Sequence, residues 1–236
     1  MKLIAHRAGT ERYPEQSMMA ARDSLSRGAD FAEIDVRLTA DRIPVICHDA
    51  NVMRIYGVDR VVEEMTLDEF LCLRQTKDPA MATYTLEMAL KNGIVPALLH
   101  IKRDPIEDLP LILDVIARCG AQNKVIMGVG NPLFVERIKA FDARIGVLAF
   151  MHALEDMDAF LATPCDIIRL WEPWLTQERI DRVHAGGKQA FVMSGTFDTV
   201  GYTRRENLKL WRDMGADGIL VNEIIWAQTE LEEATP

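Results

Sequence analysis

Short runs of apolar and β-branched residues alternate with amphipathic helical patterns along almost the whole chain. We expect eight strands, at residues 3–6, 31–38, 97–102, 124–128, 145–150, 167–170, 189–193 and 218–221. Helical patterns lie between them, at residues 17–27, 105–118, 132–141, 154–162, 177–185 and 204–214. Strands that alternate with helices form a parallel sheet, because each helix returns the chain to the same edge of the sheet. The alternation therefore predicts an α/β fold.

Two α/β arrangements fit such an alternation, the closed barrel and the open doubly wound sheet. Eight βα units within 236 residues are typical of the (β/α)8 barrel, or TIM barrel. An open sheet usually has fewer strands and a glycine-rich nucleotide loop after the first, and the sequence contains neither GxGxxG nor a P-loop. We therefore expect residues 1–236 to form a single TIM-barrel domain with a parallel eight-stranded sheet.

The segment at residues 43–92 interrupts the alternation. It contains a short apolar run at 43–47, a charged loop, and helical patterns at 67–73 and 86–91. We interpret this segment as a small insertion between the second and third barrel strands.

The formal net charge is −9, from 27 basic and 36 acidic side chains. Such a chain repels nucleic acid and anionic membranes, so recognition of a phosphate requires a local pocket. The sequence turns polar at residue 6, too early for a secretory leader, and has no apolar run of about 18 residues. The cysteines lack CxxC spacing, which predicts reduced thiols. We expect a cytoplasmic protein without a nucleic-acid partner or stable membrane association; the sequence does not indicate an oligomeric state.

Catalytic groups of a parallel barrel lie at the carboxyl ends of its strands. The second expected strand carries Glu33 and Asp35, which are two residues apart and therefore face the same side. Ala32, Ile34 and Val36 face the other side, toward the helices. We expect the two carboxylates to point together into the barrel mouth.

Two adjacent carboxylates stay ionised only if a cation or hydrogen-bond donor compensates them. A divalent metal ion or Lys102 meets this need, and His100 lies two residues before that lysine. A structural ion pair with an arginine is the alternative interpretation of Glu33 and Asp35. The combination with histidines at the ends of other apolar runs favours a metal site.

His6 follows the first strand and His48 follows the apolar run at 43–47. Imidazole both accepts and donates protons near neutral pH, so the pair suits general acid and base catalysis. Arg7 offers a planar donor fork that suits a phosphate or carboxylate. Structural hydrogen bonds for the histidines and a surface salt bridge for Arg7 are the alternatives. Together these residues supply the parts of metal-assisted phosphodiester cleavage.

Six short blocks follow one another near the N-terminus: His6-Arg7-Ala8-Gly9, Pro14-Glu15-Gln16-Ser17, Gly28-Ala29-Asp30, Glu33-Ile34-Asp35-Val36, Thr39-Ala40-Asp41 and Val45-Ile46-Cys47-His48-Asp49. Their order and spacing resemble the HRG, PENT, GAD, ExDV, TxD and HD blocks of the glycerophosphodiester phosphodiesterase family. Later segments at residues 66–70, 85–87 and 215–220 also resemble landmarks of that family.

The resemblance implies a TIM-barrel hydrolase that cuts glycerophosphodiesters into glycerol phosphate and an alcohol, with one divalent cation, often Mg2+ or Ca2+. It implies catalytic roles for His6 and His48 and phosphate binding by Arg7. It also implies metal binding by Glu33 and Asp35, and it matches Lys102 to the lysine of an ExK element.

His100 stands where the ExK element has a third carboxylate. An imidazole there removes one negative charge and mixes nitrogen with oxygen ligands, which weakens the binding of Mg2+ or Ca2+. Either His100 is a ligand and the site prefers Mn2+ or Zn2+, or two carboxylates and water molecules hold Mg2+. We prefer the second hypothesis because Mg2+ usually keeps several water molecules. Further departures from the family blocks are Ala8, Gln16, Ser194 and Asn222.

Three other functions remain open. A related lipid phosphodiesterase would act on lysophospholipids or sphingolipids, and a metal-dependent aldolase or isomerase would use the carboxylates to hold an enolate. A non-enzymatic barrel would bind a phosphate ester with weak or no turnover, because the third ligand is altered. The sequence identifies neither the leaving alcohol nor which histidine is the acid.

Overall fold

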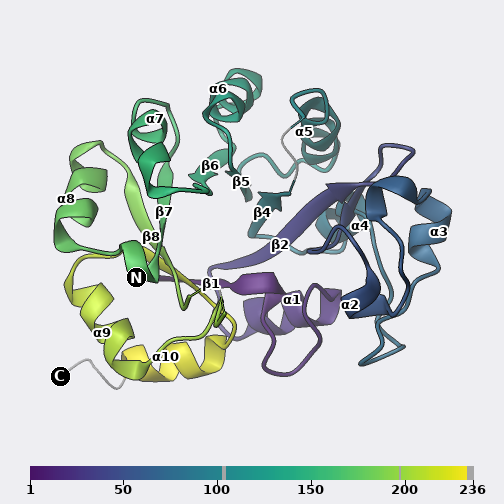
Figure 1. Ribbon diagram of the computed structural model, residues 1–236, viewed down its shortest axis with the longest axis horizontal. Coiled ribbons are helices and arrows are strands. Elements are labelled where there is room, and N and C mark those ends of the chain that lie inside the picture. The colour runs from purple at the N-terminus through teal and green to yellow at the C-terminus, as the bar shows by residue number, and fades with distance from the viewer. Residues whose placement is uncertain (103–104, 197, 233–236) are drawn as a thin grey trace.

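The computed structural model describes residues 1–102, 105–196 and 198–232. Eight parallel strands close into a barrel (Figure 1): β1 (Lys2–Ala5), β2 (Phe31–Leu38), β4 (Ala97–Ile101), β5 (Val125–Val129), β6 (Gly146–Ala149), β7 (Ile167–Trp171), β8 (Gln189–Met193) and β9 (Gly218–Val221). The barrel closes because β1 pairs with β9 on one side and with β2 on the other. The predicted TIM barrel is confirmed.

The helices form a ring around these strands (Figure 1). They are α1 (Met18–Ser26), α4 (Leu86–Lys91), α5 (Leu109–Arg118), α6 (Pro132–Phe141), α7 (Met157–Leu161), α8 (Gln177–Ala185), α9 (Arg205–Asp213) and α10 (Ile224–Glu232). Several begin at a side chain that accepts a hydrogen bond from the first turn, as Ser17, Thr85, Asn131 and Thr176 do. Such caps satisfy backbone N–H groups that have no partner within the helix.

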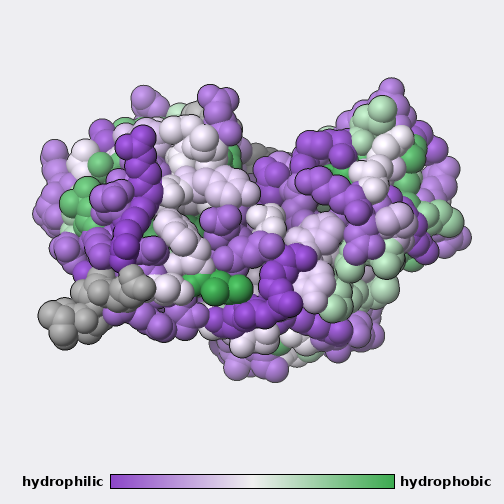
Figure 2. Space-filling model, turned by 90° about the horizontal axis from the view of Figure 1, so that it is seen from below, coloured by the Kyte–Doolittle hydropathy of each residue, from purple (hydrophilic) through white to green (hydrophobic). Residues whose placement is uncertain are grey.

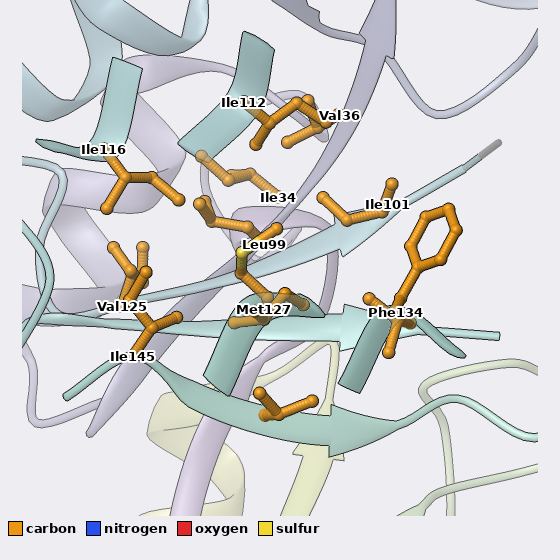
Figure 3. Packing of buried hydrophobic residues seen from close by; sticks show 14 of the residues in the cluster. Ile34, Val36, Leu99, Ile101, Ile112, Ile116, Val125, Met127, Phe134 and Ile145 are labelled. Carbon is orange, nitrogen blue, oxygen red and sulfur yellow. The ribbon is translucent and has the colours of Figure 1, made fainter. Parts of the chain in front are cut away.

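The main core lies between the strands and the helices. Ile34 and Val36 of β2 and Leu99 of β4 belong to the same buried cluster as Ile112 and Ile116 of α5 (Figure 3). Because successive side chains of a strand point to opposite faces, burial of these residues outside the barrel turns their neighbours inward. A second buried cluster fills the barrel interior; it includes Ile4, Leu98, Ile126, Leu148, Phe191 and Leu220.

The segment between β2 and β4 contains β3 (Pro44–Ile46), α2 (Met53–Tyr56), the 3-10 turn η2 (Val62–Glu64) and α3 (Leu67–Leu71). β3 runs antiparallel to the end of β2, with Val36 opposite Ile46. The segment has its own small core, formed by Val45, Cys47, Val52, Tyr56, Val62, Met65, Phe70 and Leu73. Helix α4, which follows, packs into the main core instead. Because β3 pairs with the carboxyl end of β2, it lies beside the barrel mouth.

Some elements differ from the sequence prediction. α5 begins at Leu109, four residues after the predicted start at residue 105. The predicted helix at 154–162 divides into the 3-10 turn η3 (Leu154–Asp156) and α7. Helix α10 was missed, because only Ile224 and Ala227 are buried and its apolar residues form no clear stripe.

No helix of the described residues is long and apolar enough to cross a membrane. On the face drawn in Figure 2, hydrophilic side chains predominate and hydrophobic ones lie in smaller groups.

Candidate active site

Two carboxylates lie side by side at the mouth of the barrel. The side chains of Glu33 and Asp35 on β2 are each 1% exposed. The backbone N–H of Arg7 donates to Oε2 of Glu33 over 2.6 Å. Nε2 of Gln16 donates to Oδ2 of Asp35 over 2.6 Å, and the N–H of Asp35 donates to Oε1 of Gln16 over 3.2 Å. The Gln16 amide thus holds both the backbone and the side chain of Asp35.

The two carboxyl groups have opposite pKa shifts. Burial and the adjacent Asp35 raise the pKa of Glu33 well above its ordinary value. Burial also acts to raise the pKa of Asp35, but Lys102 and His100 hold it below its ordinary value. Nζ of Lys102 lies 3.4 Å from Oδ1 of Asp35. Lys102 therefore compensates Asp35 more fully than Glu33, and Glu33 holds its proton more tightly than an ordinary glutamate does.

His100 of β4 lies directly opposite Asp35 in the sheet register. Its Nδ1 is 2.9 Å from Oδ1 of Asp35 and 3.7 Å from Oε1 of Glu33. The imidazole stacks on the ring of Phe150, with centroids 3.9 Å apart and planes 8° from parallel. Burial lowers the pKa of His100 to about 4. His100 is therefore neutral near pH 7, which is the form that binds metal ions.

The donor set of Glu33, Asp35 and His100 fits a divalent cation. One ligand atom from each residue lies within 4.8 Å of the others. Oδ1 of Asp35 is buried without a hydrogen-bond partner, although Nδ1 of His100 is close to it. Two ligands at about 2.1 Å from a shared ion lie at most about 4.2 Å apart, and both separations from His100 Nδ1 are shorter than this. A cation between these atoms would satisfy the buried oxygen and favour the ionised form of Glu33.

His6 begins the 3-10 turn η1 (His6–Ala8) at the end of β1. Its Nδ1 lies 2.7 Å from Oδ1 of Asn222, and Nδ2 of Asn222 donates to the carbonyl oxygen of Val200 over 2.9 Å. This contact orients the Asn222 amide so that its oxygen accepts the N–H of His6. Burial, with a further contribution from Arg7, lowers the pKa of His6 to about 3. His6 is thus neutral, with an unprotonated Nε2.

His48 belongs to a closed ring of hydrogen bonds between five side chains. Nη1 of Arg7 donates to Glu15 over 2.8 Å and Nη2 of Arg7 lies 3.0 Å from Nε2 of His48. Nδ1 of His48 is 2.6 Å from Asp49, and Nε of Arg54 donates to Asp49 over 2.6 Å. Arg54 closes the ring by pairing with Glu15. The ring fixes His48 with Nδ1 toward a carboxylate and Nε2 toward Arg7.

Two cavities meet at this site. The first, about 390 Å3, is lined by the predicted metal ligands together with Lys102 and Arg169. The second, about 770 Å3, is lined by Glu15 and Arg54 among others. Both include His6 and Arg7 in their walls. The structure therefore brings together every predicted site residue: His6, Arg7, Glu33, Asp35, His48, His100 and Lys102.

The sequence alone did not identify several residues of the site as functional. Glu15, Gln16 and Asp49 stand within the sequence blocks, but their contacts depend on how the loops fold back. Arg54 comes from α2 and carries no separate signal. For Arg169, a signal was present, since a charged residue at an inward position of a barrel strand is unusual.

The model of the glycerophosphoryl diester phosphodiesterase family matches residues 6–142. The chain belongs to this family. An uncharacterised Bacillus subtilis protein is 27% identical over 128 residues, which cover 54% of this chain and 52% of that protein. The chain therefore spans about half the length of this curated relative.

Solved structures share the fold over nearly the whole chain. A glycerophosphoryl diester phosphodiesterase described as putative, from Silicibacter pomeroyi, has a TM-score of 0.83 at 18% identity, with 99% of this chain and 93% of that chain covered. An Oleispira antarctica phosphodiesterase in complex with sn-glycerol-3-phosphate has a TM-score of 0.82 at 19% identity, with 98% and 97% covered. At these identities the likeness concerns the fold.

Replacing Gln16 by alanine removes the amide that orients Asp35. Loss of such a supporting contact typically weakens metal binding about 10- to 100-fold. We expect Gln16→Ala to raise the dissociation constant of Mn2+ by this factor, measured by titration calorimetry. Gln177→Ala, on the exposed surface of α8, is the matched control and should bind Mn2+ as the parent does. Equal affinities in the parent and in Gln16→Ala would show that Asp35 needs no such support.

Replacing Asn222 by aspartate places a carboxylate against Nδ1 of His6. The carboxylate stabilises the imidazolium, so the pKa of His6 should rise in an NMR titration. The parent should lose stability as the pH falls from about 6.5 toward about 3, because unfolded His6 binds a proton that the folded state excludes. Asn222→Asp should lose less over this interval. Asn92→Asp, at the exposed end of α4, controls for the added charge. An unchanged His6 pKa in Asn222→Asp would contradict the contact between Asn222 and Nδ1 of His6.

Proposed function

We propose that this protein hydrolyses glycerophosphodiesters to glycerol phosphate and an alcohol, with one divalent metal ion held by Glu33, Asp35 and His100. The observation that carries the proposal is the meeting of this ligand set with two separately held histidines in one cavity. Membership of the family and the bound product of the Oleispira phosphodiesterase support the same substrate class.

Arg7 and Lys102 supply the positive side chains for the phosphate. Arg7 reaches the wall of both cavities, and Lys102 lies beside Asp35. Cations held in a desolvated pocket stabilise the charge that builds on non-bridging oxygens in the transition state. A divalent ion held by Glu33, Asp35 and His100 would add Lewis-acid polarisation of the phosphoryl group.

The two histidines differ in their partners, and this difference supports different roles for them. Asp49 contacts Nδ1 of His48 and stabilises the imidazolium that forms when His48 accepts a proton. His48 is therefore the base toward the nucleophile, which is water or the neighbouring glycerol hydroxyl. His6 is the acid in this scheme, and it must gain a proton before it can protonate the departing oxygen, because burial keeps its pKa low in the free protein.

Binding of the phosphodiester prepares both histidines through Arg7. When Arg7 turns to the phosphate, it releases Nε2 of His48, which it contacts in this structure. The phosphate also neutralises Arg7, whose charge is the second cause, after burial, of the low pKa of His6. The same anion thus uncovers the base and removes one of the causes that disfavour protonation of the acid.

The position of His100 favours the first of the two metal hypotheses. Its Nδ1 is close to both carboxylates, and a neutral imidazole with two carboxylates suits a borderline metal better than Ca2+. We therefore propose that His100 is a ligand and that Mn2+ is preferred over Mg2+, with Zn2+ as a further candidate.

Release of glycerol 3-phosphate from glycerophosphoethanolamine and glycerophosphocholine tests the activity. We expect His48→Gln and His6→Gln each to lower turnover about 100-fold or more, since proton transfer contributes about 10²- to 10⁴-fold. His184→Gln, on the exposed face of α8, is the control.

Parental turnover in both His48→Gln and His6→Gln would overturn the proposed roles. Faster release from lysophosphatidylcholine than from the deacylated diesters would support the lipid phosphodiesterase instead. Binding of glycerol 3-phosphate without turnover of any diester would support the non-enzymatic barrel, and turnover only of an enolisable sugar phosphate would support the aldolase or isomerase.

His100→Glu tests the ligand. Glutamate restores an all-oxygen donor set, so the metal preference of the variant should move from Mn2+ toward Mg2+. An activity assay over a panel of metals and direct metal titrations measure this preference. An unchanged preference and affinity would remove His100 from the metal site.

A further inference from the structure

Arg169 is a buried cation that the proposed reaction does not use. It lies on β7, where Ile168 and Leu170 pack outside the barrel, so its side chain points inward. The residue is 3% exposed. Nη2 donates to the carbonyl oxygen of Met151 over 3.0 Å, while Nε and Nη1 are buried without a hydrogen-bond partner. Among the described residues, no carboxylate forms an ion pair with it.

Aromatic rings hold the Arg169 guanidinium in place. Its central carbon lies 5.0 Å from the ring centre of Phe150, 4.7 Å from that of Trp171 and 5.8 Å from that of Trp174. Such cation–π contacts orient a guanidinium and leave its N–H groups available in the plane. Gly128 makes room for this stack, because a Cβ there would lie 2.4 Å from the Phe150 ring. The side chain is therefore positioned without a counter-ion.

The position of Arg169 relates it to the proposed reaction. It lines the same 390 Å3 cavity as Glu33, Asp35 and Lys102. Residues that follow β5 and β6, such as Gly130 and Phe150, and residues of β7 and β8, such as Trp171 and Met193, form much of this cavity, whereas Glu15 and Arg54 line the neighbouring one. A phosphodiester whose phosphorus lies near Arg7, where the cavities meet, would place one of its two arms beside Arg169.

A buried guanidinium without a counter-ion is costly for the folded state. Burial lowers the pKa of Arg169 to about 9, so the group is still charged near pH 7. Arg7 and Lys102 already have carboxylates close by, at Glu15 and Asp35. Arg169 is therefore the cation of this cavity that has no carboxylate partner among the described residues.

We propose that Arg169 forms a subsite for an anionic group, such as a carboxylate, on the alcohol arm of the phosphodiester. This inference rests on the proposed function and names its preferred substrate class. Nε and Nη1 would donate to the anionic oxygens, and the faces of Phe150 and Trp171 would keep the guanidinium in position.

Glycerophosphoserine and glycerophosphoethanolamine differ only by one carboxylate, so they test the subsite directly. We expect the parent to have the higher kcat/KM for glycerophosphoserine, by about tenfold or more, the scale of a hydrogen bond to a charged group. Arg169→Met, which keeps an unbranched side chain without the charge, should reduce this preference at least about tenfold. Arg144→Met, at an exposed turn before β6, is the control and should keep the parental preference. An unchanged preference in Arg169→Met, including equal losses on both substrates, would overturn the proposal.

A binding measurement separates this proposal from the proposed function. In titration calorimetry, the parent should bind phosphoserine more tightly than phosphoethanolamine, and Arg169→Met should bind the two alike. If the parent hydrolyses no diester, the proposed function fails, yet this binding difference would still support the subsite. Equal binding of phosphoserine and phosphoethanolamine by the parent would overturn the proposed subsite.

The stability of the variant distinguishes a ligand subsite from a structural arginine. Because Arg169→Met removes a buried charge without a partner, its denaturation midpoint in urea should equal or exceed that of the parent. A midpoint clearly below the parental value would show that Arg169 stabilises the barrel and would overturn the proposal. Arg169→Lys, which keeps the charge, should retain part of the preference for glycerophosphoserine.

Discussion

The repulsion between Glu33 and Asp35 is the constraint around which the mouth of the barrel is built. Both side chains point inward because their neighbours on β2 are buried against the helices. Two like charges that are 1% exposed cannot both ionise without compensation. The N–H of Arg7, the amide of Gln16 and the ammonium of Lys102 provide part of it. The remainder is the positive charge that a cation would bring.

Two of these donors, Arg7 and Gln16, come from backbone in left-handed conformations. Arg7, Ala8 and Gln16 have φ values of 51°, 71° and 59°. For a residue with a Cβ this costs about 1–2 kcal/mol, which explains why the related blocks have glycine where this chain has Ala8. The Ala8 methyl is fully buried, and burial of one such group contributes about 0.8 kcal/mol. Part of the penalty at Ala8 is therefore offset by packing.

The parts of the structure that follow from local periodicity were predictable. The period of two along β2 was enough to place Glu33 and Asp35 inward, and the same reasoning applies to His100 on β4 and to Lys102, the residue that follows this strand. Contacts between loops were not predictable, because their partners are distant in sequence. Asn222 meets His6 across 216 positions. Arg169 illustrates a further limit, since a missing partner can be recognised only when all neighbours are placed.

The charges that line the metal cavity indicate what the site can hold. Arg7 is balanced by Glu15, and the remaining charged side chains are Glu33 and Asp35 against Lys102 and Arg169. With both carboxylates ionised, these four cancel, so the side chains alone provide no excess charge for an anion. A divalent cation would raise the sum to two positive charges. That excess matches one phosphodiester and one further anionic group, which is how a chain with a net charge of −9 would bind a doubly anionic substrate.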